Sequence, residues 1–173
     1  LRLVGSEMCI RDRGDVKRIT TSDGVYEART VIISTGSEYR HLGIDGEERL
    51  SGHGVSYCAT CDGFFFKDQD IVVVGGGDSA MEEATFLTRF ARSVTVVHRR
   101  DELRASAVMA KRAQEDPKIS FAWNSRVVEL HGEDSLTAVT LEDTVTGERR
   151  RLEASGLFVA IGQVPRSELV TNV

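Results

Sequence analysis

Ile71-Val72-Val73-Val74-Gly75-Gly76-Gly77-Asp78-Ser79-Ala80 places an apolar run of strand length directly before a glycine-rich turn and a helix start. In this context the first glycine permits a tight turn, the second lets a pyrophosphate approach the backbone, and a small residue lets the helix pack closely on the strand. The N-terminus of the helix adds unpaired N–H groups that favour phosphate. The stretch therefore predicts a dinucleotide site. Its candidate cofactor-binding residues are Gly75, Gly77, Asp78, Ser79 and Ala80.

The sequence on either side of this turn predicts an α/β fold. Ala80, Ala84, Leu87 and Ala91 recur at helical spacing, and the apolar strand 94–97 completes a β-α-β crossover. Further predicted elements are a helix over 104–114, strands over 119–123, 127–130, 136–141 and 149–152 with a hairpin turn at Thr146-Gly147, and an apolar strand over 157–161 that is typical of the centre of a parallel sheet. We expect a Rossmann-like domain with a parallel sheet and an antiparallel three-stranded meander.

The residues after the second strand indicate which dinucleotide binds. An NAD site places a carboxylate about 20 residues past the glycines, whereas this chain has His98-Arg99-Arg100 there, with Arg104 close behind. Guanidinium groups bind phosphate through charge-assisted hydrogen bonds, so these residues favour NADPH over NADH. The alternative is a solvated basic face at a helix start. Gly162, at the end of the last apolar strand, is a further candidate NADPH contact.

The motif Cys58-Ala59-Thr60-Cys61-Asp62-Gly63 precedes the glycine turn. Two residues between the cysteines allow one short, reversible disulfide, and Asp62 can accept and return the proton that thiol exchange requires. A zinc site would need two more ligands at suitable spacing. Because Cys9 stands alone upstream and the histidines form no paired motif, no metal is expected. The alternative for Asp62-Gly63 is a simple turn.

Composition limits the possible partners. Lys and Arg number 22 against 27 Asp and Glu, a net charge of −5, which argues against nonspecific nucleic-acid binding. No apolar run approaches the roughly 18 residues of a membrane span, and we expect a cytoplasmic protein with no membrane partner.

The N-terminal part is less regular. Residues 1–13 show no strand or helix period, and Val4 to Arg13 resembles a translated sequencing adapter, so this segment is expected to be non-native or disordered. Residues 16–28 predict a hairpin around Ser22-Asp23-Gly24, and 30–34 predict an apolar strand that ends at Thr35-Gly36. Residues 43–54 are expected to connect elements with little structure of their own.

Four motifs in one order resemble the bacterial-type, low-molecular-weight thioredoxin reductases. They are Val55 to Gly63, Gly75 to Ala80, His98-Arg99-Arg100-Asp101, and Gly156 to Gly162. That family has an FAD domain interrupted by an NADPH domain that carries the redox cysteines. The resemblance implies part of the FAD domain over 14–40, the NADPH domain over 41–164, and a truncated return to the FAD domain over 165–173. It also implies that Thr35 and Gly36 lie near FAD.

The implied activity is reduction of thioredoxin by NADPH through FAD and the disulfide. By family position Cys61 would face the flavin, Cys58 would attack the thioredoxin disulfide, and Asp62 would be the acid/base. The complete protein would be a homodimer, and this chain alone, as a fragment, would hold no FAD and turn over no substrate. Two alternatives are a related flavin-dependent reductase with another disulfide partner and an NADP-binding fragment without turnover.

Overall fold

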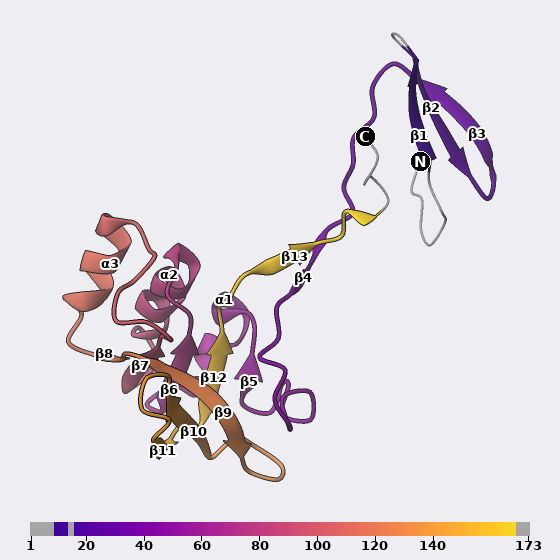
Figure 1. The fold of residues 1–173 in the computed structure, drawn as a ribbon. Helices are drawn as coiled ribbons and strands as arrows, with labels where there is room; N and C mark the ends of the chain where they lie inside the picture. Colours follow the sequence, from indigo (N-terminus) through magenta and orange to yellow (C-terminus); the bar gives the residue numbers. More distant parts are fainter. Residues whose placement is uncertain (1–8, 14–15, 169–173) are drawn as a thin grey trace. The chain divides into compact units, whose positions relative to one another are not determined.

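The computed structural model describes residues 9–13 and 16–168 (Figure 1). The chain divides into two compact units, with boundaries between residues 38 and 39 and between 162 and 163. The sequence predicts the corresponding boundaries at 40/41 and 164/165. The larger unit, Tyr39–Gly162, contains the glycine turn and the Cys-x-x-Cys motif.

A five-stranded parallel sheet in the order β5-β12-β6-β7-β8 forms the centre of the larger unit. Its strands are β5 Val55–Ser56, β6 Asp70–Val74, β7 Ser93–Val97, β8 Ile119–Ala122 and β12 Gly156–Val159. Every residue of β12 is buried, and the strand lies between β5 and β6. Its predicted central position is therefore confirmed, because only a strand covered on both faces can be apolar throughout.

Alternate side chains of β6 enter two separate hydrophobic layers. Ile71 and Val73 pack with the buried residues of α2, Asp78–Leu87. Val72 and Val74 pack on the other face with buried residues of the antiparallel meander. The sheet is thus enclosed between a helical layer and a second sheet (Figure 1).

The meander consists of β9 Ser125–His131, β10 Ala138–Asp143 and β11 Arg149–Glu153, in the order β11-β10-β9. Both strand pairs are antiparallel, as the alternating sequence predicts. The predicted turn at Thr146-Gly147 is confirmed, since Gly147 has φ +75°. Asp143 closes this turn by accepting the backbone N–H groups of Val145 and Thr146, and these bonds lower the pKa of its carboxyl.

Two helix boundaries differ from prediction. Ala91 is buried, but α2 has already ended at Leu87. The second helix, α3, spans Ala107–Gln114 rather than starting at Arg104. The backbone N–H groups of Arg104 and Ala105 both donate to the carbonyl of Gly76, at 2.7 and 3.0 Å, so this segment is held against the glycine turn and cannot join the helix.

The smaller unit contains an antiparallel sheet of β1 Cys9–Arg13, β2 Val16–Thr21 and β3 Gly24–Ala28. The predicted hairpin over 16–28 is confirmed. Residues 9–13 are not disordered, since they pair with β2 through backbone groups that need no side-chain pattern. The other expectation for residues 1–13, that they are non-native, stays a prediction. Residues 1–8 lie outside the described residues.

The predicted strand over 30–34 is not formed. None of the described strands pairs with it, and the side chain of Ile32 is 93 % exposed. A strand requires a neighbour for its backbone hydrogen bonds, so an apolar run alone does not make one.

Two short strands, β4 Ser37–Tyr39 and β13 Gln163–Pro165, pair where the chain passes between the units. Next to them, the N–H of Arg40 donates to the carbonyl of Gly162 at 3.0 Å. No helix in the described part of the chain is both long enough and apolar enough to cross a membrane.

Candidate functional site

The turn between β6 and α2 requires glycine at its first position. Gly75 has φ +152°, and a Cβ there would lie 2.4 Å from the carbonyl oxygen of Ala160 and 2.7 Å from the Cβ of Ala80. Ala80 itself is completely buried. The turn is therefore packed between β12 and α2, as the prediction for Gly75 and Ala80 supposes.

The third glycine faces open space instead. A Cβ at Gly77 would meet no atom within 4 Å. Asp78 and Ser79 follow it as exposed residues at the start of α2, and Asp78 accepts the backbone N–H of Ser106 at 2.7 Å. The backbone of Gly77 and the first N–H groups of α2 are thus free to receive a phosphate.

Gly76 supports His98, which the sequence places among the phosphate-binding residues. A Cβ at Gly76 would lie 2.2 Å from the His98 ring, so the imidazole packs directly on the backbone of the turn. His98 is only 6 % exposed, and burial, followed by the nearby arginines, lowers the pKa of its ring despite a backbone hydrogen bond that opposes them. Burial therefore disfavours the charged form of the His98 ring, the nearby positive charges come from arginine, and the role of His98 as an NADPH contact stays a prediction.

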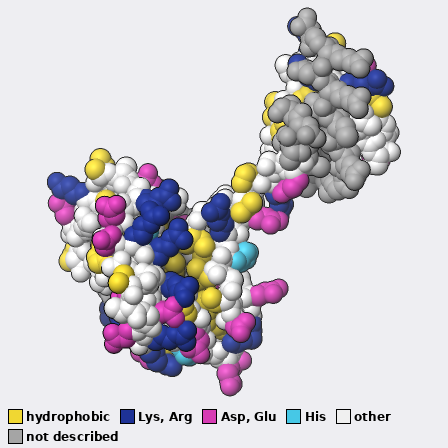
Figure 2. Space-filling model, in the orientation of Figure 1, with side chains coloured by type: hydrophobic (Ala, Val, Ile, Leu, Met, Phe, Trp, Pro, Cys, Tyr) yellow, Lys and Arg dark blue, Asp and Glu magenta, His cyan; other side chains and the backbone are white. Residues whose placement is uncertain are grey.

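A hollow of about 1340 Å³ opens from the glycine turn. Gly75 to Ser79, His98, Arg99, Arg104 and Gly162 line it, together with the β10–β11 hairpin over 142–147. Arg100 is exposed but is not among the lining residues. Figure 2 shows Lys and Arg side chains gathered in a band across the larger unit on the face that is drawn. The structure therefore brings most of the predicted nucleotide contacts to one basic hollow.

The β10–β11 hairpin was not foreseen as part of this hollow. The Thr144 hydroxyl donates to the carbonyl of Arg99 at 3.2 Å, and the Thr144 N–H donates to the carbonyl of Asn124. The N–H of Asn124 in turn donates to the carbonyl of Arg100 at 3.1 Å. The hairpin thus holds the backbone of the arginine segment in place, through contacts for which the sequence offers no signal.

The cysteine pair lies at the start of the short helix α1, Ala59–Asp62, which continues into the 3-10 helix Gly63–Phe66. Cys58 and Cys61 form a disulfide, as their spacing predicts. The N–H of Cys61 lies 3.2 Å from the sulfur of Cys58, and the N–H of Asp62 donates to the carbonyl of Cys58. As whole residues, Cys61 is exposed and Cys58 is partly buried.

Asp62 is hydrogen-bonded to a buried serine next to the cysteines. The hydroxyl of Ser56 donates to Oδ2 of Asp62 at 2.6 Å and accepts the N–H of Cys58 at 3.1 Å. Ser56 ends β5 and is 4 % exposed. The sequence predicts a role for Asp62 but assigns none to Ser56, although Ser56 lies within the motif Val55 to Gly63.

A second polar cluster adjoins the disulfide. The buried carboxylate of Glu47 accepts the N–H groups of Leu42 and Gly43 at 2.9 and 2.8 Å and the hydroxyl of Tyr57 at 2.8 Å. His41 contacts the same hydroxyl at 2.8 Å. Burial and the Glu47 carboxylate raise the pKa of Tyr57 well above its ordinary value. Gly43, where the predicted loose connector 43–54 begins, and Leu42 before it are therefore tied through Glu47 to Tyr57, the residue before Cys58.

The remaining candidates lie in the smaller unit. Thr35 and Gly36 precede β4, and Gly36 has φ +76° with no atom within 4 Å of a Cβ built there. Its carbonyl accepts the N–H of Arg166 at 3.0 Å. This open backbone leaves room for a ligand, and the assignment of both residues to FAD stays a prediction.

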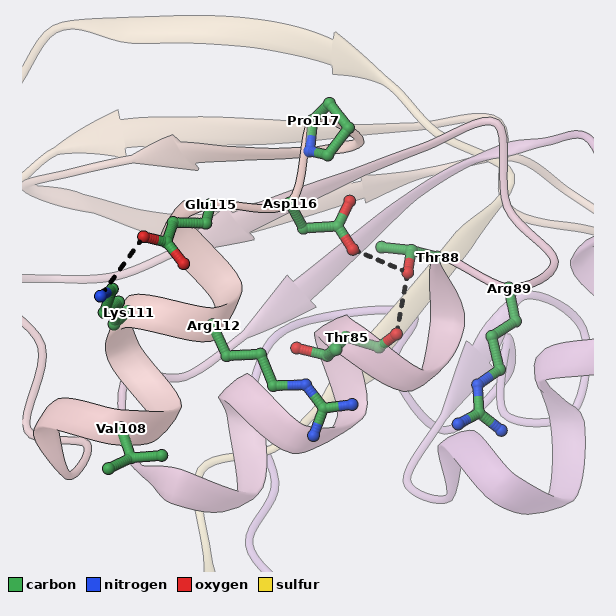
Figure 3. A pocket seen from close by; sticks show the side chains of 9 residues that line it. All are labelled: Thr85, Thr88, Arg89, Val108, Lys111, Arg112, Glu115, Asp116 and Pro117. Atoms are coloured by element: carbon green, nitrogen blue, oxygen red, sulfur yellow. Dashed lines mark hydrogen bonds and ion pairs between the residues drawn. The ribbon is translucent and has the colours of Figure 1, made fainter.

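A separate hollow lies between α2 and α3 (Figure 3). Thr88 donates to Asp116 at 3.0 Å, and Lys111 pairs with Glu115. Arg89 and Arg112 also line this hollow. It borders the C-terminal end of α2, one helix length of about 15 Å from the glycine turn, so it is distinct from the nucleotide hollow.

Glu83 of α2 has a partly buried carboxyl whose Oε2 has no hydrogen-bond partner among the described residues. Burial, with a smaller effect of the Glu82 charge, raises its pKa from 4.5 to about 7. The folded state therefore holds this proton more tightly than the unfolded state does. Protonated Glu83 therefore stabilises the folded state fully at pH values below its unfolded pKa of 4.5. This contribution to the free energy of unfolding is lost as the pH rises through its folded pKa of about 7.

We expect Glu83→Gln to raise the free energy of unfolding at about pH 8 and to change it little at about pH 5. After allowance for partial solvent exposure, the gain at the higher pH is about 1–2 kcal/mol. Urea unfolding at both pH values measures it. Glu82→Gln, at the exposed neighbour, is the control and should give less than about 0.5 kcal/mol. An equal gain at both pH values would show that Glu83 does not titrate in this range.

A glycine turn at the carboxyl edge of a parallel sheet, in one unit with an accessible Cys-x-x-Cys disulfide, is the arrangement of a nucleotide-dependent disulfide oxidoreductase. The sequence matches the pyridine nucleotide-disulphide oxidoreductase family over residues 5–173, and the chain belongs to that family. Within the family it is similar to thioredoxin reductases. That of Streptomyces clavuligerus is 67 % identical over 157 residues, which cover 90 % of this chain and 49 % of the relative.

Two further comparisons agree. A bifunctional thioredoxin reductase/thioredoxin of Mycobacterium leprae is 56 % identical over 93 % of this chain and 35 % of its own length. The crystal structure of Lactococcus lactis thioredoxin reductase superimposes with a TM-score of 0.85 at 44 % identity, covering 98 % of this chain and 56 % of that one. The chain spans about half the length of the curated relatives it matches.

Proposed function

We propose that the chain works in a thioredoxin-disulfide reductase that passes electrons from NADPH through FAD and the Cys58–Cys61 disulfide to thioredoxin. The observation that carries the proposal is the presence, in one compact unit, of the redox pair and of a basic hollow built on the glycine turn. The relatives named thioredoxin reductase support the same activity.

The residues that line the hollow support NADPH as its ligand. The open backbone at Gly77 and the N-terminus of α2 would bind the pyrophosphate, and Arg99 and Arg104 would bind the 2′-phosphate. NADPH and FAD supply hydride and electron-transfer chemistry that no side chain of this protein provides. For FAD, the open backbone at Gly36 supports Thr35 and Gly36 as contacts.

The cysteine pair would perform the exchange with thioredoxin. In the reduced protein one thiol loses its proton to Asp62, and the thiolate attacks the thioredoxin disulfide to form a mixed disulfide. Asp62 returns the proton to the thioredoxin sulfur released in that step. The second cysteine then gives its proton by the same route and displaces thioredoxin, which leaves as a dithiol while Cys58 and Cys61 become a disulfide. The resemblance assigns the attack to Cys58, but the greater exposure of Cys61 favours Cys61 for this step.

A stoichiometric exchange tests this function on the chain itself. We expect the reduced protein, freed of reductant, to convert one equivalent of an oxidised bacterial thioredoxin to its dithiol form, measured by thiol alkylation and mass spectrometry. The oxidised protein is the control and should transfer nothing. Absence of transfer from the reduced form, with intact transfer to a low-molecular-weight disulfide, would favour the alternative of a different disulfide partner. Homodimer formation and a cytoplasmic location stay predictions from the sequence.

A further inference from the structure

The environment of Asp62 contains a group that neither the motif nor the proposed mechanism uses. Ser56 lies six residues before Asp62, on β5 rather than on α1, and its hydroxyl is the side-chain contact of the Asp62 carboxylate at 2.6 Å. The same oxygen contacts both backbone groups of Cys58, the N–H at 3.1 Å and the carbonyl at 3.4 Å. Ser56 thus connects the acid/base candidate with the backbone of the redox cysteine.

A hydroxyl offers one hydrogen and two acceptor sites, which is what this position requires in both protonation states of Asp62. When Asp62 is a carboxylate, the Ser56 hydrogen is donated to it and one lone pair accepts the Cys58 N–H. When Asp62 has taken a proton from a thiol, its own O–H can donate to the second lone pair. The Ser56 hydrogen can then turn to the Cys58 carbonyl.

We infer that Ser56 is a positioning residue that holds Asp62 in place for proton transfer during thiol–disulfide exchange. The inference rests on the proposed role of Asp62 as the acid/base. Ser56 does not itself exchange the proton, since its burial and its hydrogen bonds direct it to Asp62 and to the backbone of Cys58 rather than to a partner. Removing the hydroxyl frees the carboxylate to rotate away, and displacement of a catalytic group by about 1 Å can cost up to about 10²-fold in rate.

The test uses the reduced 173-residue chain and oxidised glutathione at neutral pH, where thiols are mostly protonated. A thiol proton passes to Asp62, and the thiolate attacks glutathione disulfide to form a mixed disulfide; the glutathione thiolate that leaves takes the proton back from Asp62. The second cysteine gives up its proton by the same route, displaces the other glutathione and closes the Cys58–Cys61 disulfide. The chain is thereby oxidised and one glutathione disulfide becomes two thiols. Rates are followed by quenching with iodoacetamide and by mass spectrometry.

We expect Ser56→Ala to slow this exchange about 10-fold and Ser56→Thr, which keeps a hydroxyl, to stay within about 3-fold of the parent rate. Asp62→Asn should be slower than either serine variant. The decisive result is the double variant: Ser56→Ala added to Asp62→Asn should cause no further loss, because there is no acid/base left to position. Ser56→Gly, which also lacks the hydroxyl, should match Ser56→Ala even if one of the two is less stable.

The matched control is Thr140→Val, which removes another buried hydroxyl bonded to a carboxylate, that of Glu129 at 3.1 Å in the meander. It should leave the exchange rate unchanged. A parent rate in Ser56→Ala, or losses that multiply in the double variant, would overturn the role of Ser56. The proposed function is tested separately, by the stoichiometric exchange between the parent protein and thioredoxin. Failure of the inference about Ser56 is therefore distinguishable from failure of the proposed function.

Discussion

Replacement of either redox cysteine by serine is expected to abolish electron transfer from the chain to thioredoxin. Cys58 and Cys61 form one disulfide, and two electrons leave the pair only when both sulfurs take part. A single remaining thiol can form a mixed disulfide but has no neighbour to resolve it. We therefore expect no measurable thioredoxin dithiol from Cys58→Ser or from Cys61→Ser in the stoichiometric exchange.

The two variants should differ in what they trap. A thioredoxin variant that lacks its second cysteine, with its remaining cysteine activated as a mixed disulfide with thionitrobenzoate, would trap the complex as the attacking thiolate displaces thionitrobenzoate. Cys58→Ser should give the larger yield because the remaining Cys61 is exposed. Non-reducing electrophoresis and peptide mapping identify the linked sulfur. A larger yield from Cys61→Ser would instead support attack by Cys58, as the family resemblance implies. Near-parent thioredoxin reduction by either variant would mean that the disulfide is structural.

The second large effect concerns the choice of nucleotide. We expect Arg99→Ala combined with Arg104→Ala to weaken NADPH binding by about 10²-fold or more, since each charge-assisted bond to a phosphate contributes about 1.5–3 kcal/mol. Both side chains line the hollow beside the glycine turn. NADH has no 2′-phosphate, so its affinity should change by less than about 3-fold. Calorimetric titration with each nucleotide measures the ratio of parent to variant affinity for NADPH and for NADH.

The hollow between α2 and α3 provides the matched control for this double variant. Arg89→Ala combined with Arg112→Ala also removes two positive charges, at exposed positions that line this other hollow (Figure 3). It should leave both nucleotide affinities near the parent values. Equal losses of NADPH affinity in the two double variants would reduce the effect to overall charge, and a parallel loss for NADH would show that the arginines do not read the 2′-phosphate. Arg100→Ala should weaken NADPH binding less than Arg99→Ala or Arg104→Ala does, because Arg100 does not line the hollow.

Local patterns were sufficient for the elements that surround the glycine turn. The β6 strand, the glycine turn and the β7 strand follow from apolar runs, from the backbone freedom of Gly75 and from helical spacing, all of which depend on residues close together in the chain. The Cys58–Cys61 disulfide is equally local, because two intervening residues bring the sulfurs together. Short-range geometry therefore accounts for the fold class and for the redox pair.

Contacts between distant segments decided the rest. The sequence predicts His98 as a nucleotide contact but not that its ring is buried against Gly76. Residues 104–105 bind the same glycine through their backbone N–H groups and lie outside the helix. Likewise the apolar run 30–34 forms no strand without a neighbour, and Ser56 reaches Asp62 only because β5 ends beside α1. Burial and hydrogen-bond pairing depend on which surfaces the assembled sheet brings together, and a side chain's neighbours in space cannot be read from its neighbours in the chain.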